Sequence, residues 1–194
     1  MKKLLYNTLS KSTLRSARSP SSESGFSLIE LAVIVVIIGV FSAIAAPAWN
    51  AFVTRQRIRA VNNQVLQALQ TAQAEAKRNK ENITVTFDNT EDPPEYQIET
   101  QPTQTIDLEG EVPEGEIQLE TLDGDGNPAN EVTFNYLGSV INKDNPDSPP
   151  PLPFKVIVSP FDSTNSPSQR CVIVQTLLGA MRTAEGNDNT TGCG

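Results

Sequence analysis

The pattern of apolar and polar positions separates two helical regions near the start of the chain. Residues 26–49 form an apolar run in which Glu30 is the one charged residue. About 20 such residues span a hydrocarbon core of ~30 Å as a helix. In residues 50–82, apolar side chains recur at spacings of three and four, which is typical of a helix with one buried face. We predict one long helix through both regions, kinked at Pro47 because proline removes a backbone donor.

The third region, residues 83–194, changes from helical to alternating periodicity. The strand candidates are residues 83–87, 96–100, 116–120, 132–136, 154–158 and 171–176. Turn segments rich in Asp, Gly and Pro separate them, including the proline run at 149–151. The sequence therefore predicts an α+β fold, in which a long N-terminal helix packs on a C-terminal antiparallel β-sheet or small β-sandwich.

Charge is distributed unevenly between the two ends of the chain. Residues 1–25 have a net charge of +4, whereas residues 83–194 have a net charge of −15. Since basic segments stay on the cytoplasmic side of a membrane, we expect the leader in the cytoplasm and the acidic domain outside. Arg55, Arg57 and Arg59 follow the apolar run, and we interpret them as a solvated cluster at the lipid headgroups. The acidic domain repels phosphate, so we expect no nucleic-acid partner.

Cysteine and histidine content limits the chemistry that the chain can perform. Cys171 and Cys193 both lie in the part expected to be exported, where an even count predicts one disulfide. The chain contains no histidine, which excludes Ser-His-Asp and Cys-His catalysis and histidine metal sites. We find no candidate catalytic residue and interpret the protein as a non-enzyme without a resident cofactor.

The start of the apolar run resembles a processing signal. Residues 24–30, SGFSLIE, are similar to the signal of type IV pilins and type II secretion pseudopilins. In that family a prepilin peptidase cuts after the glycine and the new amino terminus is methylated. The resemblance implies cleavage after Gly25, N-methylation of Phe26, and an assembly contact through Glu30, the fifth residue of the mature chain. The resemblance also implies that the protein is a substrate of the prepilin peptidase.

The resemblance also implies a division of the chain and a location for each part. Residues 1–25 would be the cleaved leader, 26–49 the transmembrane and assembly half of the helix, 50–82 its amphipathic half, and 83–194 a periplasmic or extracellular β-rich domain. The protein would be a single-pass inner-membrane protein with a cytoplasmic N-terminus that later enters a pilus or pseudopilus. Its partners would be membrane lipid before assembly, the inner-membrane assembly platform, the prepilin peptidase and methyltransferase, and other pilin subunits.

Weaker matches point to a subfamily. Several segments are similar to the carboxy-terminal part of GspH/FimT-type minor pseudopilins: residues 132–134, Gly138, Val140, residues 171–174 and residues 179–182. That subfamily folds as a long helix with antiparallel sheets. The resemblance implies a structural minor pilin or pseudopilin that assembles through its N-terminal helix into a type IV pilus or a type II secretion pseudopilus.

Other readings stay open. Ala43-Ile44-Ala45 resembles a signal peptidase site, which would release a secreted domain. Asp123, Asp125 and Asn127 stand at alternate positions, as calcium ligands do, although the rest of the EF-hand pattern fails and turn chemistry explains them equally well. Residues 179–182, GAMR, resemble a glycine-arginine segment of DNA-binding FimT-like pilins. The alternatives are therefore a ligand-binding pilin for DNA uptake or surface adhesion, or a secreted or anchored calcium-binding β domain.

The charge distribution generates the first prediction. The full chain in detergent should show no salt-sensitive binding to duplex DNA at micromolar concentration, because one arginine at position 182 cannot offset the acidic domain. Fluorescence anisotropy with a labelled duplex measures this. Binding that weakens with salt and disappears in Arg182→Ala would reverse the expectation and favour the uptake function.

Overall fold

The computed structural model describes residues 25–107, 110, 112–145, 147–161, 166–186 and 192–193, except for the side chains of Ala46 and Pro47. The chain forms two units, one ending at Ile44 and the other comprising Ala45–Gly194. Helix α1 (Leu28–Asn79) contributes to both. Most of the expected leader, residues 1–24, lies outside the described residues. So does the side chain of Pro47, and the kink expected there stays a prediction.

In the second unit, α1 packs one face into the domain. The buried face consists of small and branched apolar side chains at spacings of three and four: Ile58, Val61, Val65, Ala68, Leu69, Ala72 and Ala76. This is the periodicity that the sequence shows, so the buried face follows from the pattern. The helix ends at Asn79, earlier than the expected boundary at residue 82, and Lys80 has a left-handed φ of 59°. A residue in that conformation cannot continue a right-handed helix.

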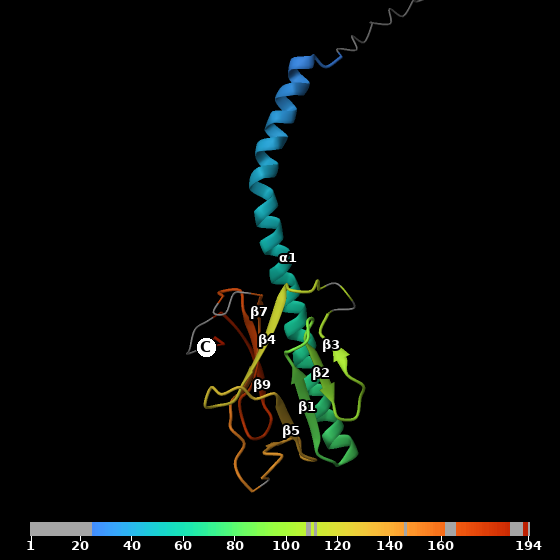
Figure 1. Ribbon diagram of the computed structural model, residues 1–194, viewed down its shortest axis with the longest axis vertical. Coiled ribbons are helices and arrows are strands. Elements are labelled where there is room, and N and C mark those ends of the chain that lie inside the picture. Colours follow the sequence, from blue (N-terminus) through green and yellow to red (C-terminus); the bar gives the residue numbers. More distant parts are fainter. Residues whose placement is uncertain are drawn as a thin grey trace, which may run out of the picture. The chain divides into compact units, whose positions relative to one another are not determined.

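Nine strands among the described residues form two antiparallel sheets. They are β1 (Ile83–Asp88), β2 (Glu95–Ile98), β3 (Gln104–Thr105), β4 (Ile117–Leu122), β5 (Glu131–Phe134), β6 (Val140–Ile141), β7 (Phe154–Pro160), β8 (Arg170–Val174) and β9 (Met181–Glu185). The first sheet has the order β3-β2-β1-β5-β6 and the second the order β4-β7-β8-β9. Figure 1 shows both sheets beside the teal-to-green part of α1. The α+β prediction is confirmed, with two sheets.

The strand predictions were wrong in detail at two hairpins. The strand expected at 132–136 stops at Phe134, because Asn135 Oδ1 accepts the backbone N–H groups of Leu137 and Ser139 at 2.9 and 3.0 Å and closes a turn. The short strand β6 follows that turn. Residues 181–185 were not among the strand candidates, but as strand β9 they pair along their whole length with β8. Their half-exposed sequence, MRTAE, lacks the apolar alternation that marks a strand.

One apolar core joins the helix and both sheets. From the first sheet, Ile83, Val85 and Phe87 point into it. The Phe87 ring stacks at 6.3 Å, between ring centroids, on Phe154 at the start of β7 in the second sheet. Phe87 therefore connects the two sheets in the interior, while the buried face of α1 fills the rest of the core.

The second sheet is buried on both faces. Val156 and Val172 face the main core, whereas Ile157 and Ile173 face a second apolar cluster that includes both cysteines. Cys171 in β8 forms a disulfide with Cys193, with a Cα–Cα distance of 5.7 Å, and this is the pairing that the sequence predicts. The bond holds Cys193 against the outer face of the sheet, where it packs with Ile157 and Ile173.

A glutamine on α1 ties two hairpin turns to the helix. Gln73 Nε2 donates to Gly138 O at 2.8 Å and to Gly179 O at 3.1 Å. Both glycines have positive φ, 78° and 74°, and a Cβ added at Gly179 would lie 2.5 Å from Gly138 O. The turns thus approach each other more closely than side chains allow. The sequence analysis noted both glycines but missed Gln73, because a glutamine in a helix gives no signal.

The core generates the second prediction. Leu69→Ala should lower the free energy of unfolding by about 2 to 5 kcal/mol, since Leu69 is 0% exposed and the truncation leaves a cavity. Gln70→Ala, on the exposed face of the same helix turn, should change it by less than about 0.5 kcal/mol. Denaturant unfolding of the two variants in detergent compares them. Equal midpoints would show that this helix face does not stabilise the domain.

Candidate functional site

The processing motif forms the start of α1. Gly25, Phe26 and Ser27 precede the helix in non-helical conformation. Ser27 caps it: its Oγ accepts the N–H of Glu30 at 3.2 Å and its carbonyl accepts the N–H of Leu31 at 3.2 Å. Glu30 lies in the first turn, where the helix dipole favours a carboxylate. The spacing of Ser27 and Glu30 is that of a capping box, so the motif also encodes a helix start.

The first unit exposes apolar surface all around its helix. Every large apolar side chain in residues 26–44 is exposed, from 41% at Ile34 to 86% at Leu28. The most apolar window of α1 has a mean hydropathy of 2.8 and no buried residue, which makes the helix a candidate membrane span. Glu30 sits in this surface, and its carboxylate has no hydrogen bond or ion pair with another described residue. Lipid or other helices must cover this surface.

The three arginines beyond the apolar run do not act together. Arg57 forms an ion pair with Glu116, which also accepts the hydroxyl of Thr54 at 3.0 Å. Arg57 thus connects α1 to the residue that precedes β4. Arg55 and Arg59 are exposed. The interpretation of one solvated cluster is therefore wrong for Arg57, because sequence does not show that a long-range carboxylate lies opposite it. For Arg55 and Arg59, contact with lipid headgroups stays a prediction.

The candidate calcium residues form a hydrogen-bonded turn. Asp123 Oδ1 accepts the backbone N–H groups of Asp125 and Asn127 at 2.9 and 2.8 Å. The hydrogen bond from the Asn127 backbone is the main cause that lowers the pKa of Asp123 from its ordinary value. Among the described residues there is no group of three His, Cys, Asp or Glu side chains that could hold a metal. Turn geometry accounts for these residues, and calcium binding stays a prediction.

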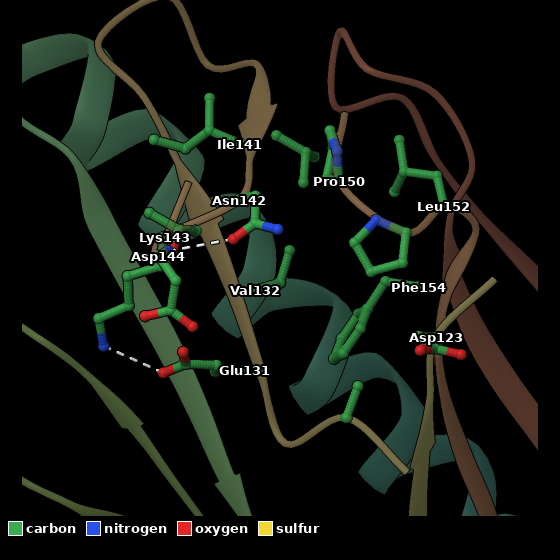
Figure 2. A pocket seen from close by; sticks show the side chains of 14 residues that line it. Asp123, Glu131, Val132, Ile141, Asn142, Lys143, Asp144, Pro150, Leu152 and Phe154 are labelled. Atoms are coloured by element: carbon green, nitrogen blue, oxygen red, sulfur yellow. Dashed lines mark hydrogen bonds and ion pairs between the residues drawn. The ribbon is translucent and has the colours of Figure 1, made fainter. Parts of the chain in front are cut away.

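The proline-rich loop packs against this turn. Gly124 N–H donates to Pro151 O at 3.1 Å. A pocket of about 250 Å³ lies beside the contact, with an apolar floor that includes Val132, Leu152 and Phe154. Figure 2 shows the ion pair of Lys143 and Glu131, 3.0 Å long, at its rim. The sequence analysis did not predict this pocket, because its walls come from segments far apart in the chain.

Comparison with known proteins adds to this geometry. Residues 20–46 match the model of the prokaryotic N-terminal methylation motif. The type IV minor pilin FimU of Pseudomonas aeruginosa is similar in structure, with a TM-score of 0.52 and 12% identity over 74% of this chain and 99% of that one. The chain has a pilin-like fold and a prokaryotic N-terminal methylation motif. The family resemblance and the fold class predicted from sequence are confirmed.

Other comparisons are weaker. The minor pseudopilin EpsH of the type 2 secretion system of Vibrio cholerae has a TM-score of 0.44 and 17% identity, over 66% of this pilin-like chain and 97% of that chain. No curated protein matches the sequence. The motif match includes Gly25, Phe26 and Glu30, but their individual roles stay predictions.

The open surroundings of Gly25 generate the third prediction. Gly25→Val should yield only an uncut precursor, about 25 residues longer than the mature form, because a branched side chain would clash in a peptidase that accepts glycine. A Cβ at Gly25 meets no atom of the chain within 4 Å, so the substitution leaves the pilin-like fold itself undisturbed. Intact mass of membrane fractions measures the outcome, with the smaller change Gly25→Ala as the matched variant. Normal-sized Gly25→Val protein would refute the assigned cleavage site.

Proposed function

We propose that the protein is a structural minor pilin or pseudopilin of the GspH/FimT type. A prepilin peptidase cuts it after Gly25, Phe26 is N-methylated, and α1 assembles the subunit into a type IV pilus or a type II secretion pseudopilus. One observation carries this proposal. The methylation motif opens a helix whose first half is exposed and apolar on all sides, on a chain with a pilin-like domain. During assembly, such a helix has to exchange its contacts with lipid for contacts with neighbouring helices.

Before assembly, the subunit spans the inner membrane once, with its N-terminus in the cytoplasm. The basic leader and the acidic domain support this orientation, since basic residues remain on the cytoplasmic side. Residues 28–44 cover about 25 Å of helix, and the apolar run continues to Trp49, so the helix spans the ~30 Å core. An assembly platform in the same membrane then receives the subunit.

Glu30 is the proposed assembly contact. Glu30 follows Phe26, whose amine cleavage frees, by four residues. Within an assembled bundle the amine of a neighbouring subunit would approach Glu30. An unpaired carboxylate in an apolar environment costs several kcal/mol, and an opposite charge offsets much of that cost. Correct pairing of subunits would therefore be favoured over register shifts that leave Glu30 unpaired.

The protein acts in this proposal as a building block and not as an enzyme. The chain has no histidine, and the described carboxylates do not gather into a metal site. The disulfide and the Gln73 hydrogen bonds keep the domain rigid, which suits a subunit that must present the same surface in every copy. The partners are other pilin subunits and the processing and assembly enzymes.

Removal of the Glu30 charge is the fourth prediction and tests the proposed function. Glu30→Gln should still insert into the membrane, be cut after Gly25 and form its disulfide, because the Glu30 carboxylate has no hydrogen bond or ion pair with another described residue. Its recovery in sheared filaments should fall at least tenfold, which corresponds to a loss of about 1.4 kcal/mol in one subunit contact. Immunoblots of membrane and sheared fractions, with the other pilins present, measure the ratio.

The control removes a charge elsewhere on the exported chain. Glu81 is exposed and lies beyond the end of α1, so the recovery of Glu81→Gln in filaments should equal that of the unaltered protein. Equal recovery of Glu30→Gln and Glu81→Gln would exclude Glu30 as the assembly contact. Absence of the unaltered subunit from every filament fraction would contradict the proposed function itself.

A further inference from the structure

A pocket rich in arginine lies between α1 and the ends of β8 and β9. Its volume is about 220 Å³, and its walls are Arg55, Arg59, Pro167, Ser168, Arg170 and Glu185. The arginines come from two elements that are more than a hundred residues apart in sequence. The fold therefore assembles a concave basic site that the sequence pattern alone does not show.

The pocket has a positive net charge in an otherwise acidic domain. Arg170 and Glu185 form an ion pair, with 2.5 Å between Arg170 Nη2 and Glu185 Oε2, and neutralise each other. Arg55 and Arg59 are four positions apart on the helix, so they lie on one face. Neither has an ion pair with another described residue. Two guanidinium groups thus remain available, whereas residues 83–194 carry a net charge of −15.

The pocket follows the apolar run by one to two helical turns. Trp49 and Phe52 are 66% and 51% exposed, and their ring centroids are 5.9 Å apart. Exposed aromatic residues at the end of an apolar span are typical of a membrane interface. Arg55 and Arg59 lie about 9 and 15 Å beyond Trp49 along the helix axis. Because helical side chains lean toward the N-terminus, both arginines lean back toward that interface.

We propose that Arg55 and Arg59, the two arginines of this pocket without an ion pair to a described residue, bind the phosphate of an anionic phospholipid headgroup while the subunit is in the membrane. This inference rests on the proposed membrane-anchored state. Guanidinium groups match phosphate oxygens with paired, charge-assisted hydrogen bonds. We choose a lipid headgroup over an acidic segment of a partner protein because the two arginines follow the exposed aromatic pair on the same helix, as they would at a membrane interface. Bound lipid would hold the domain at the membrane surface until assembly.

Lipid retention by the full chain tests this inference. The protein is purified in detergent, mixed with phosphatidylglycerol or phosphatidylcholine, and examined by native mass spectrometry. The double variant Arg55→Gln/Arg59→Gln should retain phosphatidylglycerol roughly 30-fold more weakly, as expected for two arginines at an anionic surface. Phosphatidylcholine, whose headgroup is neutral overall, should be retained weakly by all forms.

The matched control is Lys77→Gln/Lys80→Gln, which removes the same charge from the last turn of α1 and the residue just after the helix. These residues follow Arg59 by about 27 Å of helix, well beyond a Debye length of ~10 Å, so lipid retention should not change. Arg55 and Arg59 are exposed, so both double variants should unfold at the same denaturant concentration as the unaltered chain.

Each further outcome has a definite meaning. Equal retention of phosphatidylglycerol by the two double variants would overturn the inference. Inorganic phosphate that binds with the same arginine dependence and displaces the lipid would assign the site to free phosphate. Unchanged lipid retention, together with a lost crosslink between subunits, would assign the arginines to a protein contact. A chain that fails to float with vesicles would refute the membrane-anchored state and not the headgroup assignment.

Discussion

The apolar surface of the first half of α1 is the constraint on which the rest of the molecule depends. Residues 26–44 expose apolar side chains on every side of the helix, and no described part of the chain covers them. At about 25 cal/mol per Å², such a surface is far too costly to leave in water. In the proposed function, lipid would cover this surface first, and neighbouring subunits would cover it after assembly. The carboxylate of Glu30 adds a second requirement, because it needs an opposite charge in either environment.

The pattern of apolar positions changes along α1, so the two halves of the helix suit different surroundings. Up to Ile44 the apolar positions surround the helix, which suits a bilayer or a bundle. From Ile58 to Ala76 they form a single stripe that packs on the two sheets. Between them lie Trp49, Phe52 and the arginines, a sequence order that matches the depth profile of a membrane interface. In the proposed membrane-anchored state, this order would place the aromatic residues and the arginines at the interface.

The domain is held in shape by contacts that join distant segments. Phe87 and Phe154 stack between the sheets, Gln73 binds two turns, and the Cys171–Cys193 disulfide holds Cys193 on the outer face of the second sheet. None of these contacts involves the processing motif. Rigidity of the domain and assembly through the helix are therefore separate properties, and a substitution in one should leave the other intact.

The sequence by itself determined the helix, its buried face, the presence of alternating strands, the motif at Gly25 and the cysteine pair. Each of these depends on local periodicity, on a short contiguous motif or on a count, so neighbouring residues contain the information. Tertiary structure alone decided that Arg57 forms an ion pair with Glu116, apart from Arg55 and Arg59. It also decided that the turn at Asn135 ends β5 two residues before the predicted end of the strand. It also paired the polar strand β9 with β8 and brought Arg170 beside Arg55 and Arg59. These features depend on contacts between residues far apart in the chain, whose energies no local pattern records.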